Sequence, residues 1–340
     1  MSRRIVLYTV GLILLSSCVN TIPVEFGSVE PVPVMNAQFN AYAGEQDVYL
    51  SQSKVASASP VQGAKVTVYV DGEKLADVPD ISGEDDRFAG HYRFVGGFKE
   101  GQHVRLTASK DDWTLSAECD VPGTPVIEAF DTCRIKVQSF LGSSEMFQFK
   151  ITIRDIPGRT WYRVGVRRAE NYCFTDAEGN QLILPAVNDL WLDQSSDPML
   201  GSTNDVTSFF TSSDTYLVFS DEMFADGSCT LRLNTYTSWM DEPFPYVNYG
   251  EFEPVHVSAN PDVFPWLETI TFEEYCYIKA LNNLENFGYQ GQVIVEPTTI
   301  PSNVNGGIGF FAVANAAEAL KLAKKCKPYE MDMILYEDEY

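Results

Sequence analysis

The chain has 340 residues and a formal net charge of −23, with 47 Asp and Glu side chains against 24 Lys and Arg. Binding to phosphate needs clustered Lys and Arg, so this composition excludes nucleic acid and bare anionic lipid as partners. Because a chain of this length exceeds what one hydrophobic core usually organises, we expect two domains.

The first 17 residues have the pattern of a lipoprotein signal peptide. Two arginines precede an apolar run at residues 5–15, and two serines then lead to Cys18. This run is about half of the roughly 20 residues that a membrane-spanning helix needs. We predict that residues 1–17 are removed and that the acylated Cys18 anchors the chain to a membrane by lipid. The alternative is an ordinary signal peptide followed by a structural cysteine.

Residues 18–34 contain three prolines and predict a semi-stiff tether. Residues 35–124 then predict an immunoglobulin-like β-sandwich, because short strand patterns alternate with turn signals about every ten residues. The clearest strand is VTVYV at 66–70, which Asp71 and Gly72 turn into a hairpin. The acidic loop at 82–86 is expected to be solvated. A calcium ion bound there is the alternative, and no cofactor other than the lipid is predicted.

The region 125–340 predicts a second domain of antiparallel β structure, either a sandwich or barrel-like, with one or two short helices. Residues 147–153 alternate apolar and polar side chains, which is the period of a strand with one buried face. We expect this strand to pair with residues 161–167, and residues 216–219 to pair with 230–234. Between these pairs, residues 175–214 are rich in Ser, Asp and Asn and predict a long loop.

Two helices are expected near the C-terminus. Thr271 and Glu274 have the spacing of a capping box, which predicts a helix over residues 272–284. Asn315 has Glu318 three residues later and predicts the N-cap of a second helix, which Pro328 would end. The remaining tail is acidic.

Few side chains are arranged for catalysis. The chain has three histidines, no HExxH, no GxSxG and no phosphate-binding GxxxxGK[ST]. Asp221 and Glu222 are adjacent, and in a strand adjacent side chains point to opposite faces, which argues against a catalytic dyad. Six cysteines remain after Cys18. They permit disulfides, with buried free thiols as an equal alternative.

Aromatic side chains give the stronger signal for binding. Residues 236–266 combine rings with prolines, and proline at this density places part of the segment on loops. Exposed Trp and Tyr rings offer flat faces to sugars or peptide side chains. The candidate ligand-binding residues are Trp239, Tyr246, Tyr249 and Trp266, together with the 175–214 loop. The alternative is that these rings cap the open end of a β core.

Six segments resemble a Bacteroidota lipoprotein family known as domain of unknown function 4249. They are TIRDIP at 152–157, WY at 161–162, FSDEMF at 219–224, EEYCY at 273–277, EP at 296–297 and IPSNVNGGIGFF at 300–311. The last segment is the most specific. It contains Asn303, Gly306, Gly307, Gly309 and Phe310, which we interpret as a structural turn and not a ligand site.

The resemblance implies an outer-membrane lipoprotein, at the cell surface or alternatively on the periplasmic face. Members of this family tend to accompany SusC-like, TonB-dependent import barrels. A non-catalytic accessory role in the uptake of an oligopeptide or glycan is therefore expected. The alternatives are a structural or adhesive surface lipoprotein and, less favoured, a hydrolase.

Overall fold

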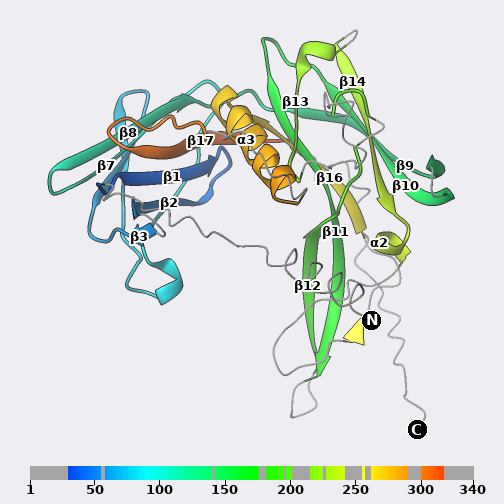
Figure 1. Cartoon of the computed structure of the whole chain (residues 1–340), viewed down its shortest axis with the longest axis horizontal. Coiled ribbons are helices and arrows are strands. Elements are labelled where there is room, and N and C mark those ends of the chain that lie inside the picture. Colours follow the sequence, from blue (N-terminus) through cyan, green and yellow to red (C-terminus); the bar gives the residue numbers. More distant parts are fainter. Residues whose placement is uncertain are drawn as a thin grey trace, which may run out of the picture.

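The structure is a computed structural model that describes residues 30–54, 58–139, 142–175, 181–194, 197–200, 215–224, 227–241, 255–256, 262–289 and 300–317. The predicted signal peptide, Cys18 and most of the predicted tether lie outside these residues. The described part is mainly β, as predicted, and its strands form one long sheet and two smaller ones (Figure 1).

The long sheet has ten strands in the described part of the chain. Its path runs through β12 (Gln181–Asp189), β11 (Trp161–Thr175), β16 (Asp262–Ile270), β17 (Ile308–Ala316), β1 (Pro33–Asn40), β2 (Gly44–Ser53) and β3 (Ala58–Pro60). Beside this path, β13 (Leu217–Ser220) and β15 (Val255–His256) pair with β11, and β6 (His91–Gly96) pairs with β2.

A four-stranded sheet covers one end of the long sheet and forms the first sandwich with it. Its order is β5 (Glu73–Val78), β4 (Lys65–Val70), β7 (His103–Lys110) and β8 (Trp113–Asp120). The alternation predicted from the sequence produces this packing, because the apolar side chains of β4, β7 and β8 meet those of β1, β2 and β6 in one core. The β4–β5 hairpin also forms as predicted, with positive φ at Asp71 and Gly72.

Strand β17 completes the first sandwich from the far end of the sequence. It pairs in parallel with β1, from Val34 opposite Ile308 to Asn40 opposite Ala314. Its Phe311 and Val313 are fully buried in the core of the first sandwich. The range 125–340, expected to be a separate second domain, therefore contains a strand of the first sandwich.

A three-stranded sheet covers the other end of the long sheet. Its order is β14 (Ser228–Tyr236), β10 (Gly142–Arg154) and β9 (Val126–Ser139). The alternating side chains predicted at 147–153 do face a core, since Phe149, Ile151 and Ile153 are fully buried against the inner face of β11. Two sheets thus pack face to face here as well, and we call this half the second sandwich.

The two strand pairs predicted for this half are wrong. Strand β10 pairs with β9 and β14, whereas β11 pairs with β16, β12 and β13. The predicted 175–214 loop is also wrong in part, because residues 181–189 are strand β12 and Leu190, Leu192 and Leu200 are buried. Residues 201–214 lie outside the described part of the chain.

The two sandwiches meet where β16 pairs with β17 through Glu268–Ala316 and Thr269–Asn315. At this junction the Thr269 hydroxyl donates to the Gly123 carbonyl, and the Asn315 amide donates to the Pro122 carbonyl at 2.9 Å. Asn315 therefore belongs to a strand and ties down the segment between the sandwiches, so its prediction as a helix N-cap is wrong. The helix predicted after it lies outside the described residues.

Helix α3 (Phe272–Tyr289) lies over this junction, on the outer face of the long sheet (Figure 1). It begins where predicted, and the Thr271 hydroxyl accepts the backbone N–H of Glu274 at 3.2 Å. The shorter elements are η1 (Asp86–Phe88), η2 (Asp221–Met223) and α2 (Ser238–Asp241). Among the described helices, none combines the length and apolar character needed to cross a membrane.

Candidate functional site

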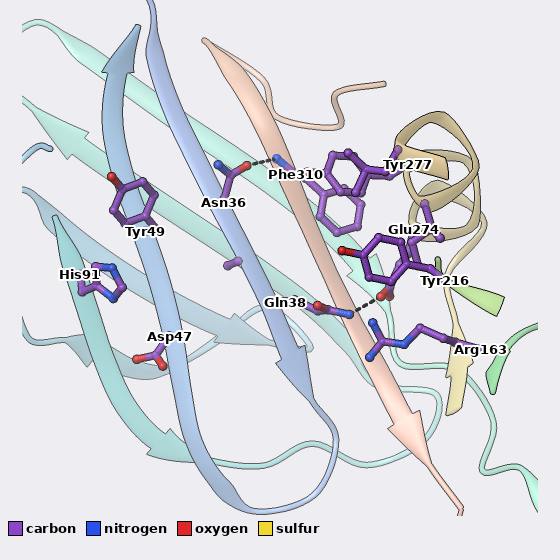
Figure 2. A pocket seen from close by; sticks show the side chains of 13 residues that line it. Asn36, Gln38, Asp47, Tyr49, His91, Arg163, Tyr216, Glu274, Tyr277 and Phe310 are labelled. Carbon is purple, nitrogen blue, oxygen red and sulfur yellow. Dashed lines mark hydrogen bonds between the residues drawn. The ribbon is translucent and has the colours of Figure 1, made fainter. Parts of the chain in front are cut away.

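A groove of about 400 Å³ lies between α3 and the outer face of the long sheet (Figure 2). A volume of this size is within the usual range for small-ligand sites. Strands β1, β2 and β6 supply one wall, while α3, β17 and β11 supply the other. The residues lining it are Asn36, Ala37, Gln38, Asp47, Tyr49, His91, Arg163, Tyr216, Glu274, Tyr277, Ile278, Leu281 and Phe310.

The wall from the first sandwich is mostly polar. Residues on β1 alternate, so Met35, Ala37 and Phe39 fill the core while Asn36 and Gln38 face outward into the groove. On the neighbouring strands, the rings of Tyr49 and His91 meet edge to face at 5.0 Å. This wall therefore offers amide groups and an aromatic pair to a ligand.

The opposite wall is more apolar. The ring of Tyr277 on α3 stacks on that of Phe310 on β17, with centroids 4.4 Å apart and planes 14° from parallel. Ile278 and Leu281 extend this surface along the helix. Together the two walls form a cleft that is apolar on one side and hydrogen-bonding on the other.

Glu274 is the least expected member of the site. In a complete capping box its carboxylate would turn back to the N–H of the N-cap residue. Here it points instead toward the sheet, where Oε1 accepts from Nε2 of Gln38 on β1 (Figure 2). Its Oε2 atom is buried and has no hydrogen-bond partner among the described residues. The reciprocal half of the predicted box therefore does not form, and this side chain is available for another role.

Burial dominates the electrostatics of Glu274. The residue is 1% exposed, and the loss of solvation raises the pKa of its carboxyl from 4.5 to about 7. This pKa already includes the lowering effect of the Arg163 charge, the raising effect of the Glu268 charge and the lowering effect of the hydrogen bond from Gln38. The groove thus contains a carboxyl group that changes charge near neutral pH.

Arg163 joins the groove to a polar strip on the second sandwich. Its guanidinium donates from Nε to Glu268 at 3.0 Å and lies 5.4 Å from the ring centre of Trp266. Arg167 lies 5.2 Å from the same centre, and Nε1 of Trp266 donates to Asp189 at 2.9 Å. This strip fixes the direction of Arg163 toward the groove.

Of the four predicted ligand-binding rings, the structure describes the side chain of Trp266, which does not line the groove. Trp266 lies flat over Gly165, where an added Cβ would be 2.5 Å from the indole. Trp239 is part of α2, but its side chain lies outside the described part of the chain, as do Tyr246 and Tyr249. An exposed aromatic pair does occur at the end of β14, where the rings of Trp191 and Tyr236 stack with centroids 5.2 Å apart.

The segment around Gly306 forms a turn that positions Phe310, and this ring, which we interpreted as purely structural, lines the groove. Asn303 binds both backbone groups of Phe311, and Gly306 has a φ of +82°. Gly307 and Gly309 pass close to the β1 backbone; a Cβ on Gly309 would be 2.0 Å from the Met35 carbonyl. Because this close packing fixes β17 against β1, it places the Phe310 ring in the groove.

The other candidate reactive groups are free thiols or paired carboxylates. Cys119, Cys133, Cys229 and Cys276 are free thiols, and burial raises the pKa of both Cys119 and Cys229 to about 12. Asp221 and Glu222 lie in η2 and not in a strand; Asp221 accepts the Thr160 N–H, and Glu222 pairs with Arg159. Within the described residues, no cluster of His, Cys, Asp and Glu could hold a metal ion.

Fold and groove define a mainly β protein of sandwich-like architecture with a ligand-sized groove at the junction of its sandwiches. The chain belongs to the family described as domain of unknown function DUF4249, whose model matches residues 19–319. No curated protein matches it.

Sequence reasoning missed Gln38, Arg163, Tyr216, Glu274 and Tyr277. Two of them, Glu274 and Tyr277, lie within the EEYCY segment that carries the family resemblance. The family resemblance therefore already included these two residues, but the capping-box spacing gave a sufficient local explanation for the presence of Glu274.

Proposed function

We propose that this chain is an outer-membrane lipoprotein of Bacteroidota and a non-catalytic accessory binding component of a SusC-like, TonB-dependent uptake system. Its cargo is an oligopeptide or a glycan. The groove carries this proposal, because a ligand-sized cleft with aromatic walls encloses a buried carboxylate oxygen that has no partner among the described residues. The predicted acylation of Cys18 supports the membrane location.

The carboxylates of the groove favour binding over hydrolysis. Glycosidases need two carboxyl groups that are both free to act on one bond. Asp47 is held by Arg93, with Nε to Oδ1 at 2.6 Å and Nη2 to Oδ2 at 3.0 Å. Among the described carboxylates that line the groove, Glu274 is the one with an uncommitted oxygen, which suits recognition of a hydrogen-bond donor.

Purification in mild detergent followed by mass spectrometry tests the accessory role. We expect a TonB-dependent barrel to copurify with the chain. Recovery of host or neighbouring-cell material without a barrel would favour an adhesive lipoprotein, and chemical conversion of added peptides or glycans would favour a hydrolase.

A second experiment tests the anchor and its location. Labelling of cells with a fatty-acid analogue should mark the wild-type chain and not Cys18→Ser. Protease added to intact cells should cut the wild-type body. A labelled Cys18→Ser variant would place the anchor elsewhere, and an uncut body would place the protein on the periplasmic face.

A further inference from the structure

Oε2 of Glu274 is a buried acceptor that has no hydrogen-bond donor among the described residues. Leaving a buried acceptor without a donor destabilises a fold, and a charged acceptor does so more strongly. Helix α3 does not need this side chain as a cap, because the hydroxyl of Thr271 already satisfies one of its first N–H groups. A ligand that donates to Oε2 would remove the penalty on binding.

The charges around the groove indicate the sign of that ligand. Glu274 and Asp47 line the groove, and Glu268 lies behind Arg163. Two guanidiniums oppose these carboxylates, but Arg163 is paired with Glu268, and Arg93 is shared between Asp47 and Glu45. Acidic groups are therefore in excess, which favours a cationic donor over a neutral one.

We propose that the groove binds short peptides by their free amino terminus, with the α-ammonium group donating to Oε2 of Glu274. This inference deepens the proposed function and rests on it. An ammonium group supplies both a hydrogen bond and the missing positive charge. The remaining N–H groups of Arg163 face the groove and suit the first peptide carbonyl, while the stacked rings of Tyr277 and Phe310 suit an apolar peptide side chain.

Tyr216 controls access to this oxygen. Its ring lies beside the Gln38–Glu274 pair and is 39% exposed (Figure 2). The backbone of Tyr216 is fixed to Asn282 by two hydrogen bonds, at 3.1 Å and 2.8 Å. Rotation of the ring therefore opens a path to Glu274 without moving β13.

The proposed pairing of the peptide ammonium group with the Glu274 carboxylate also predicts how the affinity for peptide depends on pH. The groups that face the Glu274 carboxyl are Gln38 from β1, Arg163 from β11, Glu268 from β16 and Tyr216 beside them. Affinity should rise as Glu274 ionises through its pKa of about 7. It should fall again as the peptide amine, with a pKa of about 8, loses its proton. A neutral sugar would show no such maximum.

The test uses the full chain in detergent micelles and a mixture of synthetic tripeptides whose first residues cover apolar, polar and charged types. Binding is detected by native mass spectrometry, and the dissociation constant of the tightest binder is measured by calorimetry. Acetylation of its amino terminus should weaken binding by at least about 30-fold, as expected when one partner of a buried charge pair is removed.

Two variants make the assignment specific. Glu274→Gln should lose at least about 30-fold in affinity and no longer show the pH maximum. Glu273→Gln is the matched control, because it changes the same charge on the adjacent, exposed residue of α3 and should bind as the wild type does. Circular dichroism would verify that both variants are folded.

Other results would overturn the inference. Acetylated tripeptides could bind as tightly as free ones, or none of the tripeptides could bind. A glucosamine disaccharide could also bind in their place. If a TonB-dependent barrel copurifies while any of these results is obtained, the accessory function stands and the peptide assignment fails. If free tripeptides bind but no barrel is recovered, the ligand class stands and the transport role fails.

Discussion

Replacing Glu274 by Gln should stabilise the protein at high pH. The carboxyl has a pKa of about 7 in the folded chain against 4.5 for an ordinary Glu. The folded state therefore holds a proton that the unfolded state has already lost. The stabilisation that this proton contributes is fully present below pH 4.5 and is lost as the pH rises through about 7. The difference in pKa corresponds to about 3 kcal/mol of unfolding free energy.

A glutamine at this position cannot ionise and can still accept the hydrogen bond from Gln38. The wild type should therefore lose about 2.5 kcal/mol relative to Glu274→Gln between pH 5 and pH 8. Urea unfolding of both proteins across this range measures the difference, and pH effects of other groups cancel. Glu273→Gln, at the exposed neighbour, should follow the wild type. A difference between wild type and Glu274→Gln that stays constant with pH would refute the raised pKa and its cause.

Three further predictions concern the architecture. Gly309→Ala should destabilise the fold by at least about 3 kcal/mol, because its φ is +133° and the new Cβ would be 2.0 Å from the Met35 carbonyl. Gly83→Ala, which meets no atom within 4 Å, should change the melting temperature little. Thr271→Ala should cost about 1 kcal/mol by removing the N-cap, as chemical denaturation would show, and an unchanged midpoint would argue against the cap. A fragment of residues 30–124 should give an NMR spectrum without the dispersion of a folded domain, because it lacks β17; a dispersed spectrum would contradict this role of β17.

Features set by neighbouring residues could be predicted from the sequence. Alternation at 147–153 marked a buried strand face, Asp71 and Gly72 marked a hairpin, and Thr271 marked the start of a helix. In each case the cause is local, since side-chain period, positive φ and N-capping act over a few residues. These features established the mainly β class.

Strand partners could not be predicted in the same way. Nothing within 161–167 specifies that β11 pairs with β16, about 100 positions later in the chain, and not with its neighbour β10. The prevailing polar composition of 175–214 concealed β12, although the strand itself contains the apolar run LIL at 182–184, directly before Pro185. The groove combines residues from strands β1, β2, β6, β11 and β17 and from helix α3, so its geometry became visible only in the fold.

The parallel pairing of β1 with β17 has a consequence for the order in which the protein folds. A ribosome releases β1 long before β17, because partners such as Asn36 and Phe310 lie 274 positions apart in the chain. Contacts between such distant segments close slowly. Until they form, one edge of β1 presents unpaired backbone groups that can template pairing with other chains. The chain is therefore prone to aggregate until β17 is available to pair with β1, and a chaperone that covers the edge of β1 would protect it during this interval.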